Sequence, residues 1–97
     1  MSNNYDLFTA RTTNGSSATA TVSVDGRGAV EASGTWDGAS LALEKNVQGT
    51  WVAIADADAI TADTVMGVDM VPGEYRLTLS TVGTSSINAT LHWGIRA

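Results

Sequence analysis

The sequence has no cysteine, a single histidine and no long apolar run. Without cysteine the chain has neither a disulfide framework nor a zinc–thiolate site. No apolar stretch approaches the roughly 18–20 residues of a membrane-spanning helix. The first residues also lack the basic region and apolar core of a secretory signal. We therefore expect a soluble protein that is made in a cytoplasm.

Charged side chains are scarce as well, at 15 % of the chain against about 25 % in an average soluble domain. The formal net charge is −5, and the basic residues are few and scattered: Arg11, Arg27, Lys45, Arg76 and Arg96. Phosphate backbones and anionic membranes attract clustered Lys and Arg. We therefore expect neither nucleic acid nor a membrane as a partner. Charge-poor surfaces instead suit contacts with other proteins.

The length of 97 residues corresponds to one small domain, and the 43 % apolar content is enough for a packed interior. Residues 1–17 are rich in Asn, Ser and Thr, and their only large aromatic side chains are Tyr5 and Phe8. We interpret this segment as an N-terminal arm, followed by one domain over residues 18–97. The arm is either a flexible leader or an anchor that holds a neighbouring subunit through the two aromatic residues.

From residue 18 onward apolar and polar side chains alternate, which is typical of strands with one wet face. Asp25-Gly26 and Asp37-Gly38 are hairpin signals, the 46–49 loop is a third, and Pro72-Gly73 fits a type II turn. Gly67 suggests a bulge, and the acidic segment 56–63 is interpreted as a loop between sheets. The pattern predicts a single-domain antiparallel β-sandwich or jelly roll of about seven strands, at 18–24, 28–36, 39–45, 50–56, 64–71, 74–81 and 87–95.

Gly-Thr-Trp occurs twice, at 34–36 and at 49–51. The first copy precedes a tight turn, whereas the second precedes an apolar run, and no further copy appears. We interpret the two copies as parts of strands that flank the 39–45 strand, and not as a repeat.

The three tryptophans are expected in two environments. Trp36 and Trp93 share strand parity with apolar neighbours, so the alternation predicts that both lie in the core. Trp51 has the opposite parity to its apolar neighbours and should face outward. There it would serve as an interface anchor or as a sugar-stacking platform, unless the 56–63 loop covers it.

Few residues suggest chemistry. The acidic residues Asp56, Asp58 and Asp63 point to calcium, but an EF-hand loop that starts at Asp56 has Ile60 at its fifth position and no glycine at its sixth. A looser calcium site with other loops and a solvated acidic loop both remain open. His92 is the only histidine and the chain has no cysteine, so neither a nucleophilic triad nor a histidine metal site can be assembled. We expect no enzyme, no catalytic residue, no metal and no cofactor.

Two segments combine strand patterns with turn residues: GTWDGASLALEKNVQGTWVAIAD at 34–56 and VPGEYRLTLS at 71–80. They resemble small all-β structural proteins of tailed bacteriophages and prophages, and the resemblance extends over about residues 18–95. It implies a virion component of the head-decoration type or of the tail- or fibre-associated type. The resemblance implies no catalytic residues for this chain.

Within that resemblance we expect a capsid decoration (cement) protein that binds the outside of the phage head and stabilises it as a homotrimer. The expected location is the capsid surface of the virion, and the expected partner is the major capsid protein or another virion protein. The predicted contacts are Tyr5, Phe8 and Trp51. The alternatives are a tail- or fibre-associated module and, from another class, a carbohydrate-binding β-sandwich module that uses Trp51 and a hydroxyl-rich face.

Overall fold

The computed structural model describes residues 3–17, 19–22, 26–55, 57–80 and 83–95, and of residues 3–6 and 93–95 only the backbone. These residues form nine strands and no helix, so none of them forms a helix that could cross a membrane. The prediction of an all-β domain is confirmed. The strands are β1 (Asn3–Arg11), β2 (Gly15–Ser16), β3 (Ala20–Val22), β4 (Gly26–Thr35), β5 (Ser40–Val47), β6 (Thr50–Ala53), β7 (Thr64–Met70), β8 (Gly73–Ser80) and β9 (Ser86–Ile95).

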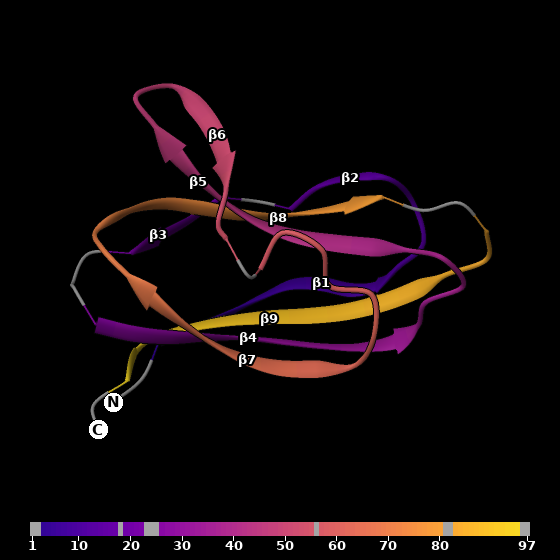
Figure 1. The fold of residues 1–97 in the computed structure, drawn as a ribbon. Coiled ribbons are helices and arrows are strands. Elements are labelled where there is room, and N and C mark those ends of the chain that lie inside the picture. Colours follow the sequence, from indigo (N-terminus) through magenta and orange to yellow (C-terminus); the bar gives the residue numbers. More distant parts are fainter. Residues whose placement is uncertain (1–2, 18, 23–25, 56, 81–82, 96–97) are drawn as a thin grey trace.

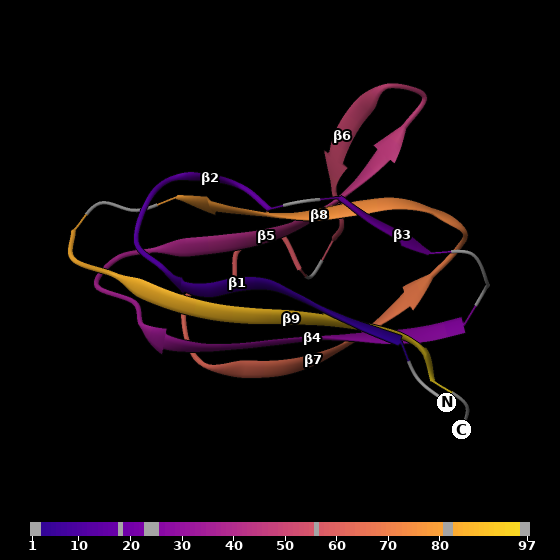
Figure 2. The same ribbon diagram turned by 180° about the vertical axis from the view of Figure 1, so that it is seen from behind.

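The strands form two antiparallel sheets that pack face to face, which confirms the predicted sandwich (Figures 1 and 2). Sheet A has the order β1-β9-β4-β7, and sheet B has the order β2-β8-β5-β6, with β3 also paired to β8. The pairing is nested along the chain: β1 pairs with β9, β2 and β3 with β8, β4 with β7, and β5 with β6. The first and last strands therefore lie side by side in one sheet.

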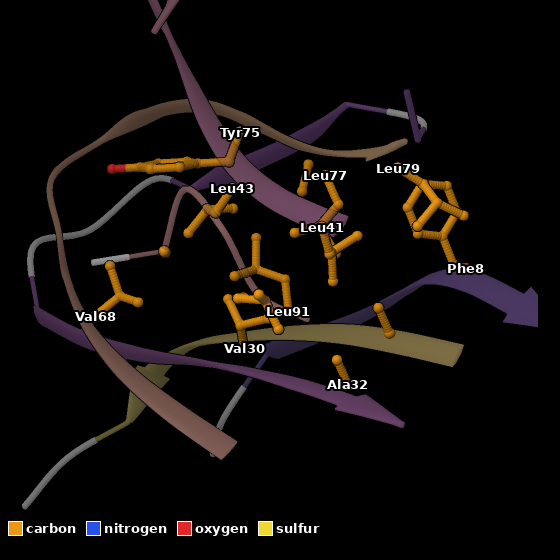
Figure 3. Close-up of a cluster of buried hydrophobic side chains, with 14 of the residues drawn as sticks. Phe8, Val30, Ala32, Leu41, Leu43, Val68, Tyr75, Leu77, Leu79 and Leu91 are labelled. Atoms are coloured by element: carbon orange, nitrogen blue, oxygen red, sulfur yellow. The ribbon is translucent and has the colours of Figure 1, made fainter. Parts of the chain in front are cut away.

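The core lies between the sheets and follows the alternation of the strands. Tyr75, Leu77 and Leu79 of β8 point inward and are at most 1 % exposed, and Val30 and Leu91 meet them from sheet A (Figure 3). Each fully buried side chain of this size contributes about 1.5–3 kcal/mol relative to an exposed one. The period of two in the sequence thus defines which face of each strand builds the interior.

Tyr75 also fixes the connection from sheet A to sheet B. Its hydroxyl donates to the carbonyl oxygen of Val71 at 2.8 Å and accepts from the N–H of Val71 at 3.1 Å. The type II turn expected at Pro72-Gly73 is not formed, because Gly73 has φ of 156° and not the roughly 80° of that turn. Gly73 instead begins β8, and the chain crosses between the sheets just before it.

The segment predicted as an arm, residues 1–17, is instead part of both sheets within its described residues. β1 lies along β9, β2 lies along β8, and Phe8 is a core residue with 3 % exposure. The pairing of β1 shifts between Asp6 and Phe8 and again before Arg11, and Ala10 has a positive φ of 48°. These irregularities break the period of two, which explains why the sequence did not indicate a strand here.

Two of the three expected hairpins are not formed. β3 pairs with β8, and β4 pairs with β9 and β7, so the strands before and after residues 23–25 belong to different sheets; Asp25 itself lies outside the described residues. The Asp37-Gly38 turn does form, with both residues at positive φ and the N–H of Ala39 donating to the oxygen of Trp36 at 2.7 Å. It leads from sheet A to sheet B, so β4 does not flank β5. Only the 46–49 loop joins paired strands, β5 and β6.

β7 pairs residue for residue with β4, from Gly26 opposite Met70 to Ala32 opposite Thr64, so the bulge expected at Gly67 is absent. The missing side chain of Gly67 leaves room for the guanidinium group of Arg27, which occupies the place of a Cβ atom. The same guanidinium donates to Asp69 at 2.9 Å.

The loop expected at 56–63 is confirmed, and it covers an edge of sheet B. Leu41 and Ile60 exchange two backbone hydrogen bonds of 2.8 Å, and the N–H of Leu43 donates to the oxygen of Ala57 at 2.8 Å. The part of β5 that belongs to the sandwich therefore pairs with this loop. The remainder of β5 pairs with β6 and extends beyond the sandwich (Figure 1).

Candidate interaction surface

Trp51 faces outward from sheet B, as its parity predicted. It lies opposite Asn46 in the β5–β6 pairing and is half-buried. The guanidinium carbon of Arg76 lies 4.3 Å from the centre of the indole ring. A cation at this distance is attracted to the electron-rich face of the ring. One face of Trp51 is therefore covered from within the chain.

A row of polar side chains holds Arg76 in this position. Glu44 accepts hydrogen bonds from Nε of Arg76 at 2.7 Å and from the hydroxyl of Thr78 at 2.8 Å, and the hydroxyl of Thr78 lies 3.1 Å from that of Ser16. We call these four residues together with Trp51 the Trp51 ladder. Because its members come from four strands, the ladder ties β2, β8, β5 and β6 together across the outer face of sheet B.

The Glu44 carboxylate is the charged centre of the ladder. Its side chain is 19 % exposed, and that of Arg76 is 27 % exposed. Partial burial acts to raise the pKa of Glu44, but the hydrogen bonds from Arg76 and Thr78 and the charge of Arg76 outweigh it, so the pKa is lowered overall. The carboxylate therefore stays ionised at neutral pH and keeps the guanidinium over the indole.

The β5–β6 hairpin stands out from the sandwich (Figures 1 and 2). Its two-residue turn has Gln48 at φ 52° and Gly49 at φ 91°, the geometry of a tight hairpin. The side chain of Asn46 braces the turn, because its oxygen accepts the N–H of Gly49 at 2.8 Å and its amide donates to Glu74 at 3.0 Å. Asn46 thus connects the projecting hairpin to β8.

The hairpin face opposite Trp51 is apolar and exposed. Val47 is 47 % exposed and Val52 is 46 % exposed, and both extend the side of β5 that is buried lower in the sandwich. The one charged residue on this face is Lys45, which lies opposite Val52 with its ammonium group 6.0 Å from the centre of the Tyr75 ring. The hairpin therefore presents aliphatic surface that no described residue covers.

Of the three predicted contact residues, Phe8 and Trp51 have described side chains, and they lie in different sheets. Tyr5 lies opposite Leu91 in the pairing of β1 with β9, and its side chain lies outside the described residues. Phe8 is buried in the core with 3 % exposure (Figure 3), so its side chain is not available to a partner in this fold. Because Phe8 is buried, the expectation that this residue contacts a partner is corrected. Trp51 is the predicted contact that the described structure leaves partly exposed.

The other tryptophans have different surroundings. Trp36 packs against the core and is half-buried, and its indole N–H donates to Asp63 at 2.8 Å. The same carboxylate oxygen accepts the N–H of Gly34 at 3.0 Å. Asp63 therefore holds the end of β4. The side chain of Trp93 lies outside the described residues.

The residues considered for chemistry are also dispersed. Asp58 is exposed, Asp63 is engaged with β4, and Asp56 lies outside the described residues. Among the described residues no three His, Cys, Asp or Glu side chains come together. His92 pairs with Glu31 at 2.7 Å on the outer face of sheet A. That contact is a surface ion pair when the histidine is protonated.

The ladder itself was not predicted from the sequence. Parity alone places Glu44, Arg76 and Thr78 on the outer faces of their strands, and this signal was available. The missing information was that β5 pairs with β8 in the register that sets Glu44 opposite Arg76. The exposure of Val47 and Val52 was missed because the strand pattern does not reveal that a hairpin leaves the sandwich.

Comparison with solved structures supports the fold. The SPBc2 prophage-derived protein YomS matches with a TM-score of 0.72 and 10 % sequence identity, over 95 % of this chain and 92 % of that chain. Two infectious bursal disease virus structures, of the Gx strain and of the VP2 subviral particle, give TM-scores of 0.40 and 0.43 at 17 % identity. They cover 94 % of this chain and 31 % and 32 % of theirs, and at these scores they carry no argument. No family model and no curated protein sequence matches the chain. The likeness to YomS thus shows a shared two-sheet fold.

Proposed function

We propose that the chain is a structural protein of a phage virion, and specifically a decoration protein on the outside of the head. The observation that carries the proposal is the two-sheet sandwich with a projecting hairpin that exposes aliphatic side chains, a shape suited to contact with another protein (Figure 1). Val47 and Val52 on this hairpin are each nearly half exposed. Two exposed aliphatic side chains on the same face of a projecting hairpin favour contact with another protein.

The strand order adds support. Nested pairing of the first strand with the last and of the inner strands with one another agrees with the proposal of a jelly roll, an architecture used in viral capsid domains and in lectins. A solved structure with the same fold over almost its whole length comes from a prophage. Both facts agree with the phage resemblance that the sequence carries.

Some of the charges on the described surface are paired within the chain. Arg27 pairs with Asp69, Arg76 with Glu44, and His92 lies against Glu31. Together with the low share of charged residues, these pairs suit a surface that lies against another protein. We propose no catalytic activity, no metal and no cofactor for this chain.

The particle itself provides the test. Virions from the genome that encodes this chain are purified on a density gradient and analysed by mass spectrometry and electron microscopy. The proposal expects many copies per particle and extra density on the head lattice. Particles made without the gene should lose that density, regain it when purified protein is added, and rupture at a lower temperature in its absence. Virions that contain no copy of the chain would overturn the proposal.

The same experiment separates the runner-up. A tail- or fibre-associated module would appear as density on the tail and leave the head bare. A carbohydrate-binding module would bind a polysaccharide panel without any particle. Trp51 is half-buried and Arg76 covers one face of its ring, so the described chain offers a single open indole face to a sugar. Glycan binding lost on Trp51→Ala, together with absence from virions, would favour that module.

From the sequence we expected a homotrimer. We keep the proposal of a homo-oligomer, because a second copy adds buried area that a domain of this size lacks. The open edge of β6 favours two copies over three.

A further inference from the structure

β6 is a sheet edge that has no charged residue, proline or bulge to protect it. Sheet B ends at β6 among the described strands, and the strand Thr50-Trp51-Val52-Ala53 contains no charge, no proline and no bulge. Natural edges are normally protected by such devices, because an open edge pairs with other chains. β1, at an edge of sheet A, has two register irregularities, and the sandwich part of β5 is covered by the loop. β6 has neither protection.

The hydrogen-bond pattern shows which groups of β6 are open. The N–H of Ile54 donates to the oxygen of Leu43 at 2.9 Å, which makes these two residues a hydrogen-bonded pair. Pairs alternate along an antiparallel ladder, so Val52 is hydrogen-bonded to its partner on β5, whereas Trp51 and Ala53 are not. The N–H and C=O groups of Trp51 and Ala53 therefore point away from β5, toward the open edge.

We propose that β6 pairs antiparallel with β6 of a second copy of this chain, around a two-fold axis at Val52. In this register Trp51 of each copy lies opposite Ala53 of the other, and their open backbone groups form the hydrogen bonds between the copies. Val52 meets Val52 of the second copy as the close, non-hydrogen-bonded pair on the axis. The result is one continuous sheet that runs through both copies.

The side chains favour a second copy over a foreign strand. The large indole of Trp51 faces the exposed small side chain of Ala53, and the half-exposed Val52 is covered by its own symmetry mate. A contact with the same patch on both sides requires this kind of self-complementarity. The symmetric register around Trp51 sets the two indoles against each other, and the one around Ala53 pairs the open groups of Ala53 but leaves Trp51 opposite a residue beyond β6.

Charge also permits this contact. The chain carries a net charge of −5, so copies repel one another in general. The four residues of β6 are uncharged. Lys45 lies opposite Val52 within each copy, so three strand spacings, about 14 Å, separate the two Lys45 positions, which is more than the screening length at physiological salt. The paired edges therefore meet without a like-charge contact.

Light scattering and sedimentation of the purified chain test the proposal, and the exposed valines provide a matched pair of variants. Val52→Asp sets two carboxylates against each other on the axis and is expected to weaken association at least tenfold. Val47→Asp changes a residue with the same exposure on the same hairpin face, but on β5, and is expected to leave the dimer intact. Circular dichroism melts establish that both variants fold.

A cross-linking experiment fixes the register, because the chain has no cysteine of its own. Val52→Cys is expected to form a disulfide between copies under mild oxidation, since the close pair on the axis meets the distance that the bond needs. Val47→Cys is the control and should stay unlinked. A chain that is monomeric up to about 1 mM, a dissociation constant worth only about −4 kcal/mol, overturns the proposal. Equal cross-linking of both variants overturns it too. Neither result bears on whether the chain occurs in virions.

Discussion

Phe8 tests whether the N-terminal segment belongs to the domain. The sequence suggested an arm, whereas the structure buries this ring in the core to 3 % exposure (Figure 3) and places the guanidinium of Arg11 5.2 Å from its centre. We consider the substitutions Phe8→Ala and Phe8→Leu. Thr9→Ala is the control, because Thr9 is the next residue of the same strand and is exposed.

The expected size follows from the burial. Truncation of a buried Phe to Ala costs about 3–5 kcal/mol, because apolar contacts are lost and a cavity remains. Phe8→Leu keeps most of the apolar volume and should cost about 1–2 kcal/mol. In a domain of this size, 1 kcal/mol lowers the melting temperature by about 4–8 °C. Thr9→Ala should change the free energy of unfolding by no more than about 0.5 kcal/mol.

Urea unfolding followed by tryptophan fluorescence and by far-UV circular dichroism measures these differences. The midpoints should rank wild type, Thr9→Ala, Phe8→Leu and Phe8→Ala from high to low, with coincident transitions for the two probes. If Phe8→Ala lowers the midpoint no more than Thr9→Ala does, the segment is not packed on the domain, and the assignment of β1 to sheet A is refuted.

Further predictions concern Glu44, Asp63 and Gly34. Glu44→Gln should cost about 1–2 kcal/mol at pH 7, because a charge-assisted hydrogen bond to Arg76 is replaced by a neutral one, and urea titrations measure it. The folded pKa of Glu44 is lowered, so the contribution of Glu44 to the free energy of unfolding is present above the unfolded pKa of about 4.3. This contribution disappears as the pH falls through the folded pKa. An equal difference in stability between Glu44→Gln and wild type at pH 7 and at pH 2 would contradict this. Asp63→Ala removes the acceptor of two N–H groups and should cost about 1–3 kcal/mol with a changed near-UV signal of Trp36, and an unchanged signal would count against the contact. Gly34→Ala should lower stability by about 2–4 kcal/mol in the same titration, because φ is 142° and an added Cβ would collide with a backbone carbonyl of β9; wild-type stability would refute that geometry.

The prediction of inward and outward faces from the sequence was right wherever the strands are regular. Leu41 and Leu43 of β5 lie two residues apart, as do Leu77 and Leu79 of β8, so alternation predicts one shared face on each strand, and all four are at most 1 % exposed. Trp51 was assigned outward by the same rule, and it is half-buried on the outer face of sheet B. The rule works because successive side chains of a strand point to opposite faces whatever strand lies beside it.

The rule did not reveal which strands are neighbours. Asp25-Gly26 and Asp37-Gly38 carry the residues of tight turns, but a turn reverses the chain equally well within one sheet and between two. Here both places lead from one sheet to the other, and the 46–49 loop joins paired strands. Pairing depends on contacts between segments far apart in the chain, such as β1 with β9, and no local pattern records them.

The sequence by itself determined that this chain is an all-β domain with little charge, because alternation and composition are local properties that each strand carries alone. Only the tertiary structure decided that Phe8 lies in the core, that Glu44 and Arg76 meet beneath Trp51, and that the β5–β6 hairpin leaves the sandwich with an open edge. These features depend on which distant strands pair and on how the two sheets pack, and no single segment of the sequence records either.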